Sequence, residues 1–233
     1  MGRIDEIYTD MPYYGVARMT AQLQHDAYTV GEKRIRRLMR QMGLEALYPK
    51  PNLSRNTASH PVYPYLLRGI VAHHPNHIWG TDITYIRMNQ GYLYLVAFLD
   101  WYSRYVVSWR LSTMLTTDFV VAAANDAFDV GIPEITNSDQ GVQFTSNDYL
   151  SLWNPEMTKI SMDGRGRAMD NIFTERLWRS VKYEEVYLNN YDSALDAKDG
   201  LSRYFDTYNR RRLHQALNYR TPADVYFERR NGS

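Results

Sequence analysis

Residues 137–182 begin NSDQGVQFTSNDYL and end NIFTERLWRSVK. Each end of this stretch carries a carboxylate, and we expect the rest of the chain to be arranged around the two. Asp139 stands just before Gly141, after a short apolar segment, so we place it where a strand ends and the chain turns. Glu175 follows 36 positions later, in a segment whose apolar residues recur every four positions, as on one helix face: Phe173, Leu177 and Val181. A strand-end Asp and a helical Glu can converge on one cation.

A third carboxylate lies in the segment IWGTDITYI, residues 78–86, which is dense in β-branched and aromatic residues and predicts a strand with Asp82 at its middle. The apolar run 92–99 predicts a second strand, and 105–111 a third. An Asp inside a buried hairpin is costly unless it is paired or bound to a metal. Asp82 is therefore the most suggestive single residue in this half of the chain.

Three carboxylates on separate elements can hold two divalent cations about 3.5–4 Å apart. Mg²⁺ suits them best, because its ligands are hard oxygens and the chain has no cysteine for a thiolate site. The other interpretation of Glu175 is a surface ladder of charges, since Arg179 and Lys182 follow at i+4 and i+7 on the same face.

The order of the elements predicts the fold class. Three antiparallel strands, a helix from Thr117 to Phe128, a strand before Asp139 and the helix of Glu175 follow one another as in a ribonuclease-H-like α/β domain. With an edge strand at 157–162, we expect a mixed five-stranded sheet flanked by helices. We assign residues 73–190 to this core and 191–233 to a C-terminal helical extension of it.

Residues 1–48 predict a small all-α helix-turn-helix domain. One helix spans 16–25, and a second starts after Thr29, which has capping-box spacing to Glu32, and stops at Gly43. The second helix is strongly basic, which favours DNA binding in the major groove over a merely solvated face. Its cations are Lys33, Arg34, Arg36, Arg37 and Arg40. Residues 49–72, rich in proline and small polar residues, predict a linker.

Charge is divided unevenly along the 233 residues. Residues 1–70 carry 10 Lys and Arg against 6 Asp and Glu, residues 71–162 carry 4 against 9, and residues 163–233 carry 13 against 11. Basic ends around an acidic middle suit a protein that grips a polyanion and holds cations at its centre. The sequence has no apolar run long enough for a membrane span and no signal peptide, so we expect a cytoplasmic protein.

Five motifs together resemble a known family: HIWGTDITYI, LDWYSRYVVSW, NSDQGVQFTS, GRAMDNIFTERLWRSVKYEEVY and YNRRRLHQALNYRTPADVY. They are similar to the integrase-core transposase encoded by the second reading frame of many bacterial insertion sequences, one of the DDE enzymes that also include retroviral integrases. The N-terminal stretches PYYGVARMTAQL and GEKRIRRLMRQMGL resemble the helix-turn-helix region of the same family. The resemblance thus spans nearly the whole chain.

The resemblance implies a DNA transposase that cleaves at the element's terminal inverted repeats and transfers the 3′ end to another phosphodiester. Asp82, Asp139 and Glu175 match the catalytic and metal-binding triad, with two Mg²⁺ ions, or Mn²⁺ in their place, in the DNA-bound state. Further DNA contacts are expected from Arg165, Arg167, Arg179 and Lys182. The implied partners are double-stranded DNA at the element ends and target, further copies of the chain in a synaptic complex, and a first-reading-frame protein, all at the bacterial nucleoid.

Two stretches depart from the family's pattern, Leu152 to Met157 and the triplet Arg212-Leu213-His214, where the family usually has Arg-Pro-His. Two other hypotheses therefore stay open. One is a catalytically silent DNA-binding regulator, or a decayed copy of the same element. The other is a structure-selective nuclease of the same fold, which would cut DNA without joining it.

Overall fold

The structure is a computed structural model that describes residues 2–11, 14–44, 63–89, 91–164 and 171–228. The chain divides into two compact units, Met1–Arg55 and Asn56–Ser233. The division falls inside the stretch 49–72 that the sequence predicts to be a linker, most of which lies outside the described residues. Each unit has a hydrophobic core of its own.

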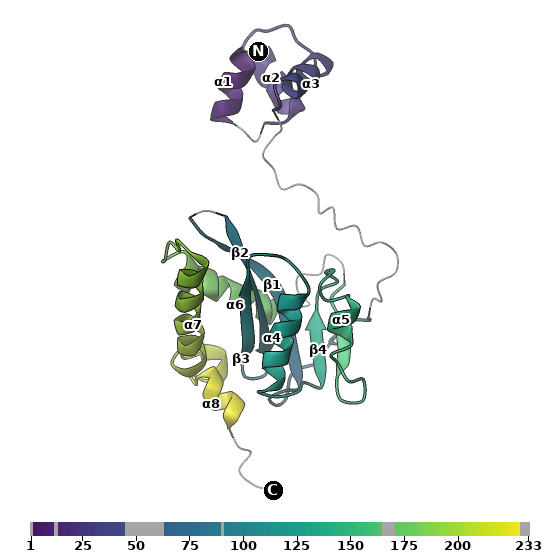
Figure 1. Cartoon of the computed structure of the whole chain (residues 1–233), viewed down its shortest axis with the longest axis vertical. Helices are drawn as coiled ribbons and strands as arrows, with labels where there is room; N and C mark the ends of the chain where they lie inside the picture. Colours follow the sequence, from purple (N-terminus) through teal and green to yellow (C-terminus); the bar gives the residue numbers. More distant parts are fainter. Residues whose placement is uncertain (1, 12–13, 45–62, 90, 165–170, 229–233) are drawn as a thin grey trace. The chain divides into compact units, whose positions relative to one another are not determined.

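The described part of the N-terminal unit forms α1 (Gly2–Asp10), α2 (Val16–His25) and α3 (Glu32–Gln41) (Figure 1). Apolar residues at helical spacing turn toward one another and form its core: Ile4, Ile7, Met19, Leu23, Ile35 and Met39. The chain leaves α3 through Gly43, whose φ of 66° lets the Leu44 amide donate to the Met39 carbonyl, so the predicted helix stop is confirmed.

The predicted capping box at the start of α3 is wrong. The N-cap is Gly31, which is extended and offers no side chain, and its carbonyl accepts from the amides of Arg34 and Ile35. Thr29 lies two residues too early to cap. Glu32 consequently occupies the first helical position rather than the third, where it still faces the positive end of the helix dipole.

The second unit is built on a five-stranded mixed sheet in the order β3-β2-β1-β4-β5. The antiparallel strands are β1 (Ile78–Arg87), β2 (Tyr92–Asp100) and β3 (Val106–Ser112). The short strands β4 (Ile135–Ser138) and β5 (Lys159–Met162) run parallel to β1. The predicted ribonuclease-H-like sheet, with its edge strand near 157–162, is therefore confirmed.

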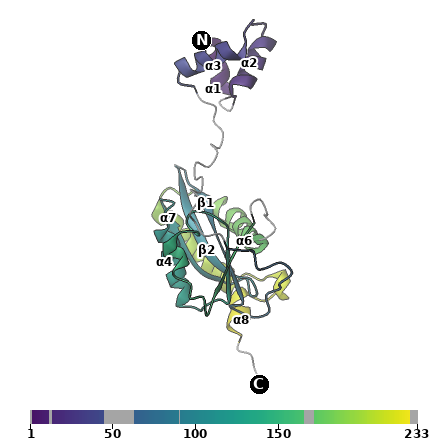
Figure 2. The same ribbon diagram turned by 90° about the vertical axis from the view of Figure 1, so that its right-hand side faces the viewer.

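Helices cover both faces of this sheet (Figures 1 and 2). One face packs on α4 (Asp118–Phe128), and the other on α6 (Ile172–Val181) and α7 (Ala194–Arg210). Strand β2 shows why: Val96 and Phe98 point to the first face, while Leu95, Ala97 and Leu99 point to the second, and all are fully buried. Shorter helices complete the unit: α5 (Asn147–Leu150), a π-helix η2 (Lys182–Val186), a 3₁₀ turn η3 (Gln215–Leu217) and α8 (Pro222–Phe227).

In the stretch Leu152 to Met157, which departs from the family's pattern, Trp153 is built into the core, whereas residues 154–157 are exposed. Trp153 is 4% exposed, and its ring meets Phe98, Phe128 and Tyr149 at centroid distances of 5.2–6.3 Å. After this stretch the chain enters β5, which pairs with β4 in a regular parallel register from Ile135↔Lys159 to Ser138↔Met162. The departure therefore leaves the path of the sheet intact.

The second departure, Leu213, lies at the surface. Its side chain is 58% exposed, so a leucine is accommodated there without repacking. The residues on either side keep a contact with each other, 3.1 Å from Arg212 Nη1 to His214 Nε2, and Arg212 also donates to both carboxylate oxygens of Glu184 at 2.6 and 2.9 Å. This cluster fixes the end of α7 against η2.

Candidate active site

Asp82 lies near the middle of β1, and both of its carboxylate oxygens are held by donors. Oδ2 accepts a hydrogen bond from Trp178 Nε1 of α6 at 2.9 Å, and Oδ1 accepts from the Ile83 amide at 2.7 Å. Burial raises the pKa of Asp82 to about 6, against the opposing effect of Trp178, and the nearby charges of Asp139 and Glu175 raise the pKa further. The carboxylate is thus oriented and poorly solvated.

Asp139 follows directly after β4, at the sheet edge where parallel strands β4 and β5 end. Its Oδ1 accepts a hydrogen bond from the Gly141 amide at 2.8 Å, which closes the turn. A Cβ on Gly141 would lie 2.8 Å from that same oxygen, so a side chain there would displace the Asp139 carboxylate. The surrounding protein raises the pKa of Asp139, although the residue keeps an open side toward solvent.

Glu175 lies in the first turn of α6 with its side chain exposed. The start of α6 is fixed on β1 by Asn171, whose Nδ2 donates to the Thr81 carbonyl at 3.3 Å and whose Oδ1 accepts from Thr174 Oγ1 at 2.5 Å. Gly80 permits this approach, because a Cβ there would lie 2.7 Å from Thr174 Oγ1 and 2.9 Å from Asn171 Oδ1. Asn171 therefore links Thr81, the neighbour of Asp82, to Thr174, the neighbour of Glu175.

The three predicted carboxylates thus come from β1, the end of β4 and α6, and two of them act electrostatically on the third. A carboxylate whose pKa is raised by two neighbouring acids belongs to a donor set that a hard divalent cation would stabilise. Among the residues that the structure describes, no three acidic or histidine side chains lie close enough together to enclose one ion. The assignment of the triad to a metal site stays a prediction.

Three neighbours of these carboxylates did not stand out in the sequence: Gly80, Asn171 and Trp178. The sequence gives a weak indication of a structural role for each of these three residues. A glycine inside a strand marks the close approach of another backbone, an asparagine just before a helix is a capping residue, and a tryptophan on a helix face brings a polar N–H that needs an acceptor. Their partners lie about 90 positions away in the sequence, so only the fold reveals which contact each one makes.

All five predicted cations of α3 are exposed: Lys33, Arg34, Arg36, Arg37 and Arg40. Within the described chain, only Arg36 among them has an acid in reach, Glu32 at 3.8 Å, and both of those side chains are more than half exposed. A pair of that kind is weak in water, so the outer surface of α3 remains strongly basic.

Arg179 and Lys182 follow Glu175 on α6 and at its C-cap. The Arg179 guanidinium lies 5.8 Å from the ring centroid of the exposed Tyr183, a distance typical of a cation–π contact. Lys182 is the residue at which α6 passes into the π-helix. Arg165 and Arg167 lie outside the described residues.

Comparison with known proteins agrees with this fold. An integrase core domain model matches residues 72–168, a second one matches 156–222, and an HTH-like domain model matches 1–52. Solved structures include the HTLV-2 integrase catalytic core domain in complex with magnesium, with a TM-score of 0.55 at 20% identity over 66% of this chain and 97% of that one. The simian T-cell lymphotropic virus intasome matches with a TM-score of 0.61 at 16% identity, over 99% of this chain and 76% of that one. The second unit therefore has the integrase-type ribonuclease-H fold.

Curated relatives are more similar in sequence. The transposase for insertion sequence element IS904 of Lactococcus lactis is 32% identical over 226 residues, which cover 94% of this chain and 88% of the relative. The transposase InsF for insertion sequence IS3A of Escherichia coli is 29% identical, over 94% of this chain and 77% of the relative. The chain belongs to the insertion-sequence transposase family, with an HTH-like domain and an integrase core domain, as its motifs predict. No described helix is long and apolar enough to cross a membrane.

Proposed function

We propose that this chain cleaves DNA at the terminal inverted repeats of an insertion element and transfers the freed 3′ end to another phosphodiester. One observation carries the proposal: three carboxylates from separate elements, Asp82 of β1, Asp139 after β4 and Glu175 of α6, lie near enough for two of them to act electrostatically on Asp82. Placing two acids near a poorly solvated third one costs stability, unless a cation joins them when the site works.

Asp82, Asp139 and Glu175 would hold Mg²⁺, or Mn²⁺ in its place, as a pair of ions in the DNA-bound state. The bound ions would activate the attacking hydroxyl and stabilise the leaving oxygen of the phosphodiester. The chain's own residues orient the ligands. Trp178 and the Ile83 amide leave Asp82 little freedom to rotate, and the Gly141 amide fixes one oxygen of Asp139. Ligands oriented before DNA binds need less reorganisation during the reaction.

The DNA partner follows from the basic surfaces. The exposed cations of α3 would enter a major groove of the element end, as the recognition helix of a helix-turn-helix does. Arg179 and Lys182 would contact the phosphates of the same DNA close to the cut. We extend the proposal to further copies of this chain in a synaptic complex and to a first-reading-frame protein, because the two ends of an element must be held together.

The test uses purified full-length chain, a labelled duplex carrying the terminal inverted repeat that flanks the gene, and Mg²⁺. We expect nicking at the 3′ end of the repeat and joining of that end to a target plasmid. Asp139→Asn should abolish both products while retaining duplex binding, because the change removes a charge from the site and leaves α3 untouched. Asp129→Asn, an exposed aspartate at the C-cap of α4, is the matched control and should react like the wild type.

The products also separate the other hypotheses. Duplex binding that depends on Arg36 and Arg37, with neither nicking nor joining under Mg²⁺ or Mn²⁺, would mean a silent DNA-binding regulator or a decayed copy. Cutting without joining and without preference for the repeat would mean a nuclease of the same fold. Equal activity of Asp139→Asn and the wild type would remove the triad from the mechanism.

A further inference from the structure

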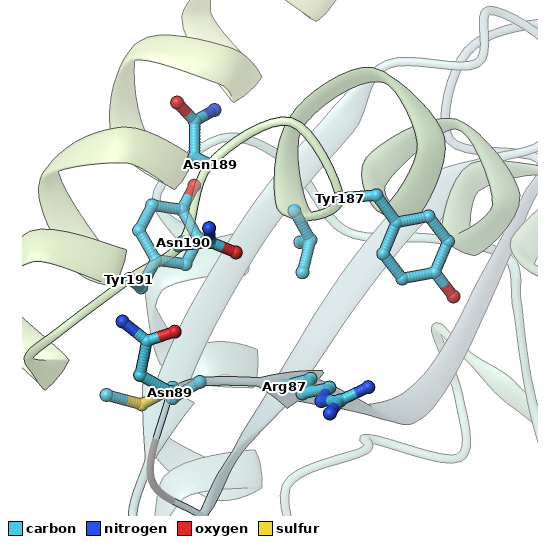
Figure 3. A pocket seen from close by; sticks show the side chains of 8 residues that line it. Arg87, Asn89, Tyr187, Asn189, Asn190 and Tyr191 are labelled. Atoms are coloured by element: carbon cyan, nitrogen blue, oxygen red, sulfur yellow. The ribbon is translucent and has the colours of Figure 1, made fainter.

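A polar pocket lies beyond the end of α6, between the tip of the β1–β2 hairpin and the segment that follows the π-helix (Figure 3). Its volume is about 340 Å³. Figure 3 shows Arg87 and Asn89 of the hairpin on one side, with Tyr187 and the run Asn189, Asn190 and Tyr191 around the rest. This volume is at the small end of the range of about 300–1,000 Å³ that ligand pockets occupy, so it suits one flat ring system.

The back wall of this pocket is rigid. Tyr191 is 3% exposed, and its hydroxyl donates to Glu185 Oε1 at 2.6 Å. Its ring packs against α7 at Gly200, where a Cβ would lie 2.6 Å from the Tyr191 oxygen. The hairpin is tied to the same wall, since the Asn89 amide donates to the Tyr191 carbonyl at 3.1 Å and Asn89 Nδ2 donates to Asp192. The pocket is therefore formed before any ligand arrives.

The front of the pocket carries groups that are not used by the fold. The side chain of Asn190 has no hydrogen-bond partner, and Arg87 has no ion-pair partner, within the described part of the chain. Tyr187 is 59% exposed although it borders the pocket, and its only ring contact there is an edge contact with Tyr183 at 5.2 Å. No acidic side chain is among the described residues that line the pocket.

These groups define a ligand class. A carboxamide both donates and accepts, which matches the edge of a nucleobase, an exposed tyrosine offers a face for stacking, and an unpaired arginine offers a contact for phosphate. We propose that the pocket binds one unpaired nucleobase of the DNA, stacked on Tyr187 and hydrogen-bonded by Asn190, with Arg87 on an adjoining phosphate. This inference rests on the proposed function, since it takes DNA to be the substrate.

The distance of the pocket from Glu175 predicts how far from the cut the bound nucleotide lies. Tyr187 follows Glu175 by 12 positions along the continuous run of α6 and η2, which corresponds to at most about 18 Å at the α-helical rise of 1.5 Å per residue, because a π-helix rises less. DNA advances about 3.4 Å per nucleotide on each strand. A strand that follows the helix from the cut, past Arg179 and Lys182, therefore reaches the pocket about five nucleotides away.

The experiment measures binding of the full-length chain to end duplexes by fluorescence anisotropy. Each duplex carries the terminal inverted repeat with a single mismatched nucleotide, and the mismatch is moved through positions 1 to 10 from the cut. A mismatch lowers the energy needed to take a base out of the stack. We expect affinity to rise by roughly tenfold when the mismatch is near the fifth position, the factor that stacking of one base gives, with little change elsewhere.

Tyr187→Ala and Asn190→Ala should each remove this preference and leave the affinity for the fully paired duplex within about twofold, because both side chains are exposed and carry no fold contacts of consequence. Tyr219→Ala is the matched control, a tyrosine that is 65% exposed and lies outside the pocket, and it should keep the preference. A wild-type profile that is flat along the duplex, or a preference that survives Tyr187→Ala, overturns the proposal. Nicking and joining of the fully paired duplex, assayed on the same preparation, report the proposed function separately, so a flat profile with intact joining rejects the pocket alone.

Discussion

Replacing Asp82 by asparagine should stabilise the second unit at neutral pH while abolishing its activity. The carboxylate lies in a poorly solvated site with two other acids near it, and its pKa is raised from 3.8 to about 6. At 1.36 kcal/mol per pKa unit, this rise corresponds to roughly 3 kcal/mol of destabilisation once the group is ionised. An asparagine oxygen can replace only one of the two acceptors that face Trp178 and the Ile83 amide, and the lost hydrogen bond costs about 1 kcal/mol. The expected net gain is about 2 kcal/mol at pH 7.

The sign of the pH dependence follows from the direction of the pKa change. Between pH 3.8 and about 6 the folded chain still holds the Asp82 proton that the unfolded chain has released. The folded state binds more protons in this window, so the contribution of Asp82 to stability falls as the pH rises through it. Below the window Asp82 is neutral in both states, and the advantage of the asparagine variant should disappear. Above it, the advantage should be constant.

The assay is urea denaturation followed by tryptophan fluorescence, with EDTA present so that no cation offsets the repulsion. All five tryptophans lie between Trp79 and Trp178, so the signal reports the second unit and not the helical N-terminal unit. Asp129→Asn, the exposed control, should match the wild type at every pH. Two results would refute the claim that ionised Asp82 destabilises the fold. One is an Asp82→Asn variant that is less stable than the wild type at pH 7. The other is a variant whose gain in stability is the same at pH 4 as at pH 7.

Three further changes test other contacts. Gly80→Ala should lower the urea midpoint of the second unit by the equivalent of at least about 1–3 kcal/mol, because the new Cβ would lie 2.3 Å from Trp101 Nε1 and 2.7 Å from Thr174 Oγ1. Trp178→Phe removes the donor that lowers the pKa of Asp82, so the acid limb of the joining rate should move to higher pH; an unmoved limb would mean that Asp82 does not control that limb. Arg37→Ala should reduce the slope of log affinity against log salt by about 1 for any duplex, as the loss of one phosphate contact does, and an unchanged slope would place Arg37 off the DNA.

Local sequence patterns were enough to predict most of the framework. The helix predicted at 16–25 is α2, Val16–His25, and the strand predicted at 78–86 is β1, Ile78–Arg87. These elements are long and strongly patterned, so their own residues determine them. The predictions that failed or were not made depend on more distant partners. Gly31 rather than Thr29 caps α3, and the five-residue π-helix after α6 has no pattern of its own.

The candidate site also has a part that local sequence patterns predict and a part that they do not. The three carboxylates could be picked out because acids in apolar strands and helices are rare unless something requires them. The contacts that orient them could not, since Trp178 and Asp82 are 96 positions apart and Asn171 and Thr81 are 90 apart. Spacing in a sequence shows which residue types are present. Which of these residues come into contact is decided by the tertiary fold, which packs α6 across β1.

The two stretches that depart from the family's pattern bear on whether this copy still works. A gene released from selection gathers substitutions without regard to burial, and misfits in the core are the commonest result. Here the two departures lie in different surroundings. Leu213 is largely exposed beside an intact Arg212–Glu184 pair, and Trp153 is buried with aromatic rings on three sides. Neither lies in the contacts that dock α6 on β1, so both are compatible with an intact site. If Mg²⁺-dependent joining nevertheless proves absent, we expect the cause in the carboxylates or the DNA contacts, because neither departure touches the contacts between α6 and β1.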